Sequence, residues 1–506
     1  MAPNIDEEAS NNDVDEAPAF IDMNTAVEVP DTTNTNNNDE MMEEDDDAMV
    51  DVAEEKTSSS IHSSQQAATA AIVDQSKATF HSHTDAIYAI ASHYDVSSGT
   101  LSIASGGGDD RAYLHRIATS SVATADGNNE QTTSNNTNTT IPLSHPHTDS
   151  ISCLSFNTPY ITSDLSNQTQ QNLLAVGSYD GSIILYDASS GSIHSTLEGP
   201  TDVEFVSFHP KGGTVLLAGS IADGTIWMYH APSKNCMQVF VGHEGGVTAG
   251  GFTPDGKWVV SAGQDGTCRV WAPKTGMSKF VFRLMENTGD NNMAGGEVGP
   301  GLTCLALGGG NDGQLAICGG EDGKAYVVHV TGKKLVATLS HFEESTSNDG
   351  ANAANDGMED DEMNEGEEGE ARSVEAVGFC PPNVPGTSNW CATGGVDGIL
   401  KIWNLNVVTA AAAGGGSAQL RQRCVRDDAQ KAGITRVKWH TSLPLVICSY
   451  TDGAVGIWDV RVGKLVGKLT GHQDMINDMS VEFVNETVLV VTGSDDRTVK
   501  MFEFRP

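Results

Sequence analysis

The sequence has little positive charge. Lys and Arg total 28 against 68 Asp and Glu in 506 residues, so the formal net charge at pH 7 is −40. Nucleic acids and anionic lipid surfaces both require clustered cations on the protein, and this balance argues against either as a ligand. We therefore expect no nucleic acid and no membrane among the partners. A basic protein or peptide is the natural complement.

Long apolar runs are also missing. No stretch approaches the ~20 residues that span a bilayer, and the N-terminus MAPNIDEEAS is acidic where a secretory signal would be basic and then apolar. The nine cysteines are scattered and contain no C-x-x-C pair, which fits packed thiols in a reducing compartment better than a disulfide or zinc framework. We expect a soluble protein of the cytoplasm, with the nucleus as a second location.

The usual catalytic motifs are absent as well. The sequence contains no G-x-x-x-x-G-K-[ST], no H-E-x-x-H, no G-x-S-x-G and no cysteine pair at metal spacing. Two histidine pairs stand close together, His81 with His83 and His145 with His147, but the second histidine of each belongs to the repeat described next. We therefore expect no enzymatic activity, no metal and no cofactor.

What the sequence does have is a repeat. A phrase of small residues, a turn Asp and an alternating strand, as in VGSYDGSIILYD (176–187), occurs eight times. The turn aspartates are Asp109, Asp180, Asp223, Asp265, Asp322, Asp397, Asp452 and Asp496. They are 71, 43, 42, 57, 75, 55 and 44 residues apart, and a period near 43 is typical of a four-stranded propeller blade, with insertions in the longer gaps. The sequence thus predicts an all-β fold, an eight-bladed β-propeller.

The two ends of the propeller are predicted to join. Blade eight lacks an outer strand because the chain stops at Pro506, whereas residues 76–82 look like an outer strand without a blade of their own. If 76–82 completes blade eight, the ring has no open strand edge to aggregate through. We also expect the protein to be a monomer.

Two segments carry most of the net charge. Residues 1–80 hold 20 acidic and 2 basic residues, and 343–371 hold 12 acidic residues and no basic one. We expect 1–74 to be a disordered acidic tail that precedes a propeller over 75–506, with disordered insertions at about 117–140, 342–371 and 405–417. These compositions cannot bury enough apolar surface to offset the entropy of ordering.

The repeats resemble those of the WD-repeat family, whose blades share a hydrogen-bond chain of His, Ser or Thr, Asp and Trp. Blade four has the whole set: His243, Ser261, Asp265 and Trp271. Elsewhere the set is incomplete, since His115 takes the Trp position in blade one, Phe502 takes it in blade eight, and blade six is expected to lack the His. A half-buried turn carboxylate must be satisfied by nearby donors, so this recurring set indicates architecture and not a catalytic triad.

Acidic loops are predicted to converge on one face. Because the His of each blade-linking loop meets the Asp of a hairpin, both kinds of loop lie on the narrower rim of the channel. Their acidic residues are Asp85, Asp149, Asp202, Glu204, Glu244, Glu321, Glu375 and Asp474. The obvious cations nearby are Lys324 and Arg372. Crowded like charges repel, and a cationic partner would relieve this repulsion. The 342–371 insertion should leave from this face and the tail from the opposite rim.

Several phrases resemble one WD-repeat family in particular, that of the angio-associated migratory cell protein. They include TDVEFVSFHP (201–210), ADGTIWMYHAP (222–232), TPDGKWVVSAGQDGTCRVW (253–271) and SVEAVGFC (373–380), together with the acidic N-terminal tail. Fungal relatives of this family are chaperones of a large-subunit ribosomal protein, and their acidic face binds its basic N-terminus. By this resemblance Glu204 and Glu375 are the first candidates for contact, with Asp202 and Glu321 next.

The resemblance and the charge pattern agree on a function. We expect a non-enzymatic propeller that acts as a dedicated chaperone, or escort, of a basic large-subunit ribosomal protein during ribosome assembly. The alternative is a general WD-repeat scaffold in signalling, in cell migration or as a substrate receptor, which would bind through the sides or the other rim of the blades.

Overall fold

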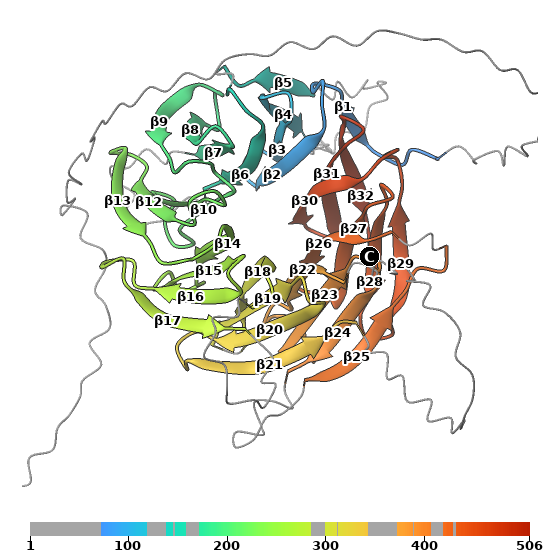
Figure 1. Cartoon of the computed structure of the whole chain (residues 1–506). Helices are drawn as coiled ribbons and strands as arrows, with labels where there is room; N and C mark the ends of the chain where they lie inside the picture. Colours follow the sequence, from blue (N-terminus) through green and yellow to red (C-terminus); the bar gives the residue numbers. More distant parts are fainter. Residues whose placement is uncertain are drawn as a thin grey trace, which may run out of the picture.

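The computed structural model describes residues 72–118, 138–144, 147–157, 172–284, 299–310, 312–342, 372–387, 389–405, 418–428 and 432–506. These residues form eight four-stranded antiparallel sheets around a central axis (Figure 1). The predicted eight-bladed all-β propeller is confirmed. Over these ranges, no helix is long and apolar enough to cross a membrane.

The first four blades follow the chain in order. Blade one holds β2 (Ile87–Asp95), β3 (Thr100–Gly107), β4 (Ala112–Ala118) and β5 (Thr139–Pro142); blade two holds β6 (Ile151–Phe156), β7 (Leu173–Ser178), β8 (Ser182–Asp187) and β9 (Ile193–Glu198). Blade three holds β10 (Phe205–Phe208), β11 (Val215–Gly219), β12 (Ile226–His230) and β13 (Asn235–Phe240); blade four holds β14 (Val247–Phe252), β15 (Val259–Gly263), β16 (Thr267–Trp271) and β17 (Ser278–Arg283).

The remaining blades continue the ring. Blade five holds β18 (Leu302–Gly309), β19 (Leu315–Gly320), β20 (Lys324–His329) and β21 (Lys334–Ser340); blade six holds β22 (Val374–Phe379), β23 (Trp390–Gly395), β24 (Leu400–Asn404) and β25 (Gln419–Cys424). Blade seven holds β26 (Ile434–Trp439), β27 (Leu445–Tyr450), β28 (Val455–Asp459) and β29 (Lys464–Leu469); blade eight holds β30 (Ile476–Val484), β31 (Thr487–Ser494), β32 (Val499–Phe504) and β1 (Ala78–Phe80).

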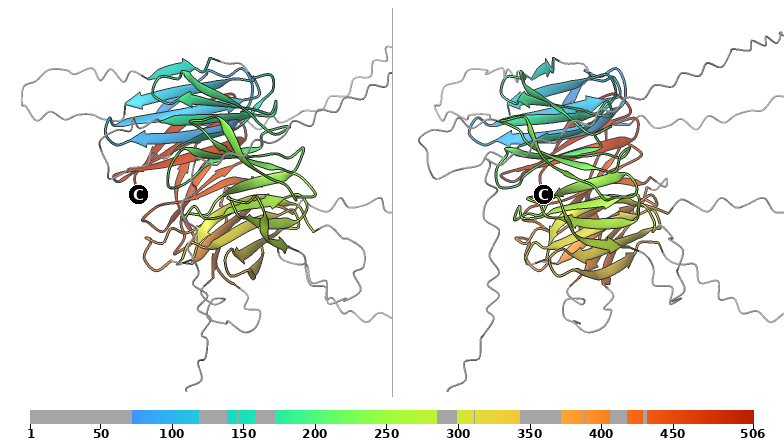
Figure 2. Two further views of the ribbon diagram at one scale, coloured as in Figure 1. Left: turned by 90° about the vertical axis from the view of Figure 1, so that its left-hand side faces the viewer. Right: turned by 60° about the vertical axis from the view of Figure 1, so that its left-hand side comes forward.

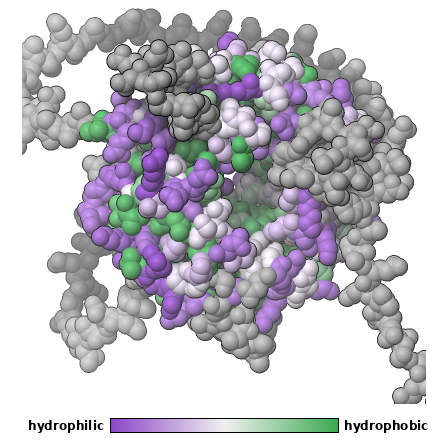
Figure 3. All heavy atoms as spheres, turned by 180° about the vertical axis from the view of Figure 1, so that it is seen from behind, coloured by the Kyte–Doolittle hydropathy of each residue, from purple (hydrophilic) through white to green (hydrophobic). Residues whose placement is uncertain are grey.

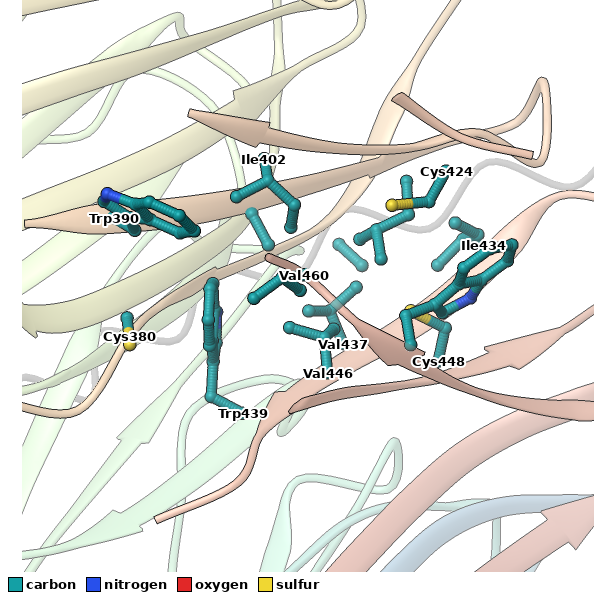
Figure 4. Packing of buried hydrophobic residues seen from close by; sticks show 14 of the residues in the cluster. Cys380, Trp390, Ile402, Cys424, Ile434, Val437, Trp439, Val446, Cys448 and Val460 are labelled. Carbon is teal, nitrogen blue, oxygen red and sulfur yellow. The ribbon is translucent and has the colours of Figure 1, made fainter. Parts of the chain in front are cut away.

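Apolar side chains fill the spaces between neighbouring blades. Between blades six and seven, Trp390, Ile402 and Cys424 of one blade pack against residues of the other that include Val437 and Trp439 (Figure 4). All nine cysteines are free. Those in the core are kept as thiols by their surroundings; burial raises the pKa of Cys424 to about 12. The cysteines therefore serve as packing side chains.

The ring closes through β1. Ala78 pairs with Met501 and Phe80 pairs with Val499, so the N-terminal strand completes blade eight as predicted. In both side views blade one, in blue, lies directly beside blade eight, in red (Figure 2). The side chain of Phe80 is buried and stacks on the ring of His115 in blade one, with ring centroids 4.2 Å apart. The closing strand therefore contributes core contacts to two blades.

The chain before β1 does not continue to the opposite rim, and that prediction is wrong. A turn at Asp74–Ser76, in which Ser76 N–H donates to Asp74 Oδ1 over 2.9 Å, redirects it. Gln75 N–H donates to the carbonyl of Thr470 at 2.9 Å, and the Thr470 hydroxyl donates to the carbonyl of Val73 at 2.8 Å. Thr470 directly follows β29, whose last residue Leu469 pairs with Val455 next to the Asp452 hairpin, so it lies on the side of the turn aspartates. Residues 73–75 thus lie near the rim that carries the acidic loops.

The predicted disordered segments fall mostly outside the described residues. At their edges, however, the structure moves the boundaries by a few residues. Asp74 binds the buried Lys500 at 2.5 Å, Ala118 ends β4, Thr139 begins β5, and Leu405 is fully buried. The insertions around 117–140 and 405–417 join third to outer strands, and the one around 342–371 joins β21 to β22, as expected.

Hydrogen-bond chains hold the hairpin aspartates in place. In blade four, His243 Nδ1 lies 3.0 Å from Asp265 Oδ1, His243 Nε2 lies 2.7 Å from Ser261 Oγ, and Trp271 Nε1 donates to the same hydroxyl at 2.8 Å. Burial alone would raise the pKa of Asp265, but the bonds from His243 and from the backbone N–H of Glu244 hold that pKa well below its usual range. The carboxylate is therefore a charged anchor of the fold.

Blade six contains a complete set, so the expectation that it lacks the His is wrong. His341 Nδ1 lies 2.7 Å from Thr393 Oγ1, His341 Nε2 lies 3.2 Å from Asp397 Oδ1, and Trp403 Nε1 donates to Thr393 Oγ1 at 2.9 Å. The sequence pattern did not reveal this histidine, because residues 343–371 separate it from the strands of blade six. In the fold it lies beside that blade, since the ends of the insertion meet at the same rim.

Other blades replace a member of the set with a different donor. In blade seven, Arg426 takes the His position and donates to Asp452 Oδ1 and Oδ2 at 3.0 and 2.6 Å. In blade one, His115 Nε2 lies 3.0 Å from Ser105 Oγ, as the Trp nitrogen does elsewhere. Each half-buried hairpin carboxylate therefore still has hydrogen-bond donors, although the type of residue that provides them differs between blades.

We predict that β1 is needed for stability and that residues 1–71 are not. Deletion of residues 1–80 removes β1 and uncovers Val499 and Met501, so it should cost at least about 3 kcal/mol, the usual cost of truncating one buried Phe. Deletion of residues 1–71 is the control and should leave the melting temperature unchanged. Equal melting temperatures for the two deletions would contradict the closure of the ring by this strand.

We also predict an acid sensitivity that originates in blade one. Burial, together with the nearby charge of His83, lowers the pKa of His115 from 6.5 to about 3. A histidine held neutral in the fold takes up its proton only on unfolding, so its contribution is lost as the pH falls below 6.5. Relative to His115→Phe, the wild type should lose about 1.4 kcal/mol per pH unit in this range, measured by chemical denaturation. Parallel pH profiles would contradict the assignment.

Candidate functional site

The first strands of the eight blades surround a central channel. β2, β6, β10, β14, β18, β22, β26 and β30 lie innermost (Figure 1), and seen from behind the centre of the molecule is hollowed (Figure 3). Each of these strands enters from the rim of the turn aspartates. The residue at the same place in every blade, directly after the first buried apolar residue, forms the channel mouth. These residues are Tyr88, Ser152, Glu204, Thr248, Thr303, Glu375, Thr435 and Asn477.

At four of these eight positions a small donor ties one blade to the next. In seven blades the strand pairing shifts its register around this residue, which frees its side chain from the regular sheet. Thr248 Oγ1 donates to the carbonyl of Leu302 at 2.7 Å, and Asn477 Nδ2 donates to that of Ile87 at 3.0 Å. Ser152 and Thr303 do the same toward Val203 and Val374. The position therefore has a structural role in four blades.

Glu204 and Glu375 break this rule. A carboxylate cannot donate a hydrogen bond to the next blade's carbonyl. Glu204 Oε2 instead accepts a hydrogen bond from the Tyr179 hydroxyl at 3.0 Å, and Glu375 Oε1 accepts one from the Ser373 hydroxyl. Among the described residues these are the hydrogen bonds that the two carboxylates receive. Both side chains are half-buried, and each keeps an oxygen available for a ligand.

The setting of Glu204 is strongly electrostatic. Burial raises the pKa of Glu204, and the charge of Asp202 adds to this rise, while the Tyr179 hydrogen bond and the charge of Arg436 oppose it. Burial and the neighbouring carboxylate likewise raise the pKa of Tyr179. A carboxylate in this position gains from the arrival of a cation, because a cation stabilises its charged form.

The structure adds residues that the sequence analysis missed. Arg436 lies on β26, and its Nε donates to Asp478 Oδ1 of β30 over 2.9 Å. The positive charge of its guanidinium acts to lower the pKa of Glu204. Two residues further along β26, burial lowers the pKa of Lys438. Both cations were overlooked because the search was confined to loops. The alternation of side chains along ITRVKWH (434–440) could have placed Arg436 and Lys438 on one face of the strand.

The other predicted acidic residues divide into two kinds. Asp202 is a structural acceptor, because its Oδ1 accepts hydrogen bonds from the Ser220 hydroxyl and from the Ala222 N–H, the latter at 3.0 Å. The remainder are exposed on the rim, where three accept the N–H of the following residue over 2.7 to 2.8 Å: Asp85, Asp149 and Asp474. Glu244 and Glu321 are exposed without such a bond among the described residues. The rim is acidic, but only Glu204 and Glu375 reach the channel mouth.

No group of three metal-ligating side chains is found in the part of the chain that the structure describes. In the close pairs seen in the sequence, the second histidine has a structural role. His83 Nδ1 lies 2.9 Å from Asp109, and His147 Nδ1 lies 2.7 Å from Ser182 Oγ. The arrangement at the channel mouth is thus one of carboxylates, hydroxyls and two cations, which suits the binding of a charged segment.

Comparisons with known proteins agree with this architecture. The family model "WD domain, G-beta repeat" matches residues 139–187, 234–272, 376–404 and 463–503. The chain is 29% identical over 429 residues to the angio-associated migratory cell proteins of dog and of human, which covers 85% of this chain and 80% of each of those proteins. The chain is a WD-repeat protein that is similar to the angio-associated migratory cell proteins over most of its length. An uncharacterised WD repeat-containing protein of Schizosaccharomyces pombe is 28% identical over 279 residues, 54% of this chain and 55% of that protein.

Solved structures share the fold of this WD-repeat protein. Sqt1 of Saccharomyces cerevisiae superimposes with a TM-score of 0.62 at 16% identity, over 86% of this chain and all of the other. Sqt1 of Chaetomium thermophilum, solved bound to the N-terminus of the ribosomal protein L10, gives a TM-score of 0.60 at 20% identity, over 85% of this chain and all of that one. Fold and family together identify a protein-binding propeller.

We predict that Asp202 contributes to stability. Asp202→Ala should cost about 1–3 kcal/mol in the free energy of unfolding, because the Ser220 hydroxyl and the Ala222 N–H lose their acceptor. Glu244→Ala removes an equally acidic but exposed side chain from the same rim and should change stability by less than about 0.5 kcal/mol. Chemical denaturation of the two variants measures the difference. Equal effects would show that Asp202 is an ordinary surface charge.

Proposed function

We propose that the channel mouth binds the basic N-terminal segment of a large-subunit ribosomal protein, and that the protein is the chaperone of that partner during ribosome assembly. The work is binding, without a chemical step. The complex would form where the ribosomal protein is made, in the cytoplasm.

One observation carries the proposal. At a position where four blades use a donor to hold the next blade, blades three and six place Glu204 and Glu375. Each gives up a structural bond to the neighbouring blade and leaves a half-buried carboxylate facing the channel. Such a loss is understandable if the carboxylates serve a ligand, because stability is commonly reduced at functional sites.

Two further facts support a basic ligand. The rim around the mouth carries exposed acidic residues, which steer a cationic segment toward it and speed its association. The Chaetomium thermophilum protein with the same fold was solved bound to a ribosomal-protein N-terminus. A basic segment that enters the mouth would meet the carboxylates of two blades at once, so arginines spaced along it could bind both.

The test is a titration with a synthetic peptide of the N-terminal segment of the same organism's counterpart of ribosomal protein L10. Isothermal titration calorimetry should detect binding that weakens as salt is raised, because screening shortens the reach of the rim charges to about 10 Å at 0.1 M. The double variant Glu204→Gln with Glu375→Gln should weaken binding by about tenfold or more, since both charges contact the ligand.

The matched control removes two charges elsewhere. Glu198 in β9 and Glu503 in β32 are exposed and lie away from the first strands, so Glu198→Gln with Glu503→Gln should leave the affinity nearly unchanged. Equal losses in the two double variants would reduce the effect to net charge and contradict the site. Binding that ignores both variants, with partners of mixed charge, would favour the general scaffold.

A further inference from the structure

The channel mouth already holds a cation that belongs to the protein. We propose that Arg436 is an internal competitor of the basic ligand: its guanidinium is held beside the mouth by Asp478 in the free protein, and an incoming cation must displace this positive charge. This inference rests on the proposed function, because it concerns the same site.

The position of Arg436 supports this role. It follows Thr435, the channel-mouth residue of blade seven, and therefore lies just inside the channel. Its Nε is 2.9 Å from Asp478 Oδ1 in blade eight, and one of its terminal nitrogens donates to the carbonyl of Thr435 at 3.1 Å. The side chain remains 47% exposed, so water and ligands can reach it.

The charge of Arg436 extends to both carboxylates of the mouth. Desolvation by the surrounding strands acts to lower the pKa of Arg436, although its side chain remains open to the channel, but the charges of Asp478 and Glu375 and the hydrogen bond to Asp478 raise that pKa. Glu204 belongs to blade three, four blades away from Arg436 in the ring of eight, and the charge of Arg436 acts to lower its pKa. The guanidinium of Arg436 is thus in contact with the carboxylate of Asp478 in blade eight, and its charge favours the ionised form of Glu204 in blade three.

The fold does not depend on this ion pair. Asp478 has a second donor, because its Oδ2 accepts the N–H of Ile90 at 2.8 Å and so links blade eight to blade one. Ion pairs as open to water as this one contribute little to stability. Arg436 can therefore move away without loss of the ring, which a displaced competitor must be able to do.

The competitor also limits which ligands bind. A single weakly held cation gains little by replacing Arg436, whereas a segment with several arginines can bind Glu204 and Glu375 together. The ring of Tyr179, which is 41% exposed and is held beside Glu204, offers a face on which a ligand guanidinium can stack. Lys438, deeper on the same strand, repels a cation that would pass the mouth. The site is thereby suited to an arginine-rich segment held at the entrance.

The test compares Arg436→Gln with Arg497→Gln by calorimetry, using the same ribosomal-protein peptide at low salt. Gln can still donate to Asp478 but carries no charge. Arg497 is an exposed cation on the hairpin of blade eight, on the same rim, so its loss changes the net charge equally. Arg436→Gln should tighten binding about fivefold or more and Arg497→Gln less than about twofold, because a charge at contact distance outweighs a distant, screened one. Arg436→Lys, which keeps the charge, should stay near the wild type.

Each outcome has a separate meaning. Equal tightening by Arg436→Gln and Arg497→Gln, or unchanged or weaker binding by Arg436→Gln with an unaltered melting temperature, overturns the competitor while leaving the site intact. If Arg436→Gln melts early, the charge-retaining Arg436→Lys decides, since tightening by that variant contradicts competition between charges. A wild-type protein that fails to bind the peptide overturns the proposed function, and the inference with it.

Discussion

The ring depends on one recurring bond, made where the inner strands of four blades enter the channel. A side-chain donor at the strand entrance reaches the backbone carbonyl of the next blade, as Thr248 does to Leu302 and Asn477 does to Ile87. Because an unpaired buried carbonyl is costly, this bond favours Ser, Thr and Asn at the position. Glu204 and Glu375 cannot make this bond, and we therefore assign them a role in binding and not in holding the ring together.

The repeat pattern was enough to predict the blades and their closure, because turn aspartates and alternating strands are local signals. The wrong predictions came from long-range relations. His341 belongs to blade six although residues 343–371 separate them, and the turn at Asp74–Ser76 redirects the chain toward Thr470. Neither follows from periodicity, because each depends on which distant segments the closed ring brings together.

The candidate site was predicted in part. A shared rim for the acidic loops followed from the pairing of loop histidines with hairpin aspartates, and the structure places those loops there. The rim residues are not equivalent, however, because Asp202 accepts hydrogen bonds from Ser220 and Ala222 within its own blade, whereas Glu204 accepts one from the Tyr179 hydroxyl of the neighbouring blade. Arg436 and Asp478 were not predicted, because only loop residues were considered for the acidic face. A channel turns the inner side of a strand into a surface, which composition alone does not reveal.

The account holds that carboxylates of two blades, balanced by one arginine, form a mouth for a basic segment. A structure of the protein with the ribosomal-protein peptide tests this most directly. The account predicts a peptide guanidinium or ammonium group within hydrogen-bond distance of Glu204 and of Glu375, with Arg436 turned away from the mouth. A peptide bound along the outer strands or on the opposite rim, with Arg436 still beside Asp478, would contradict it.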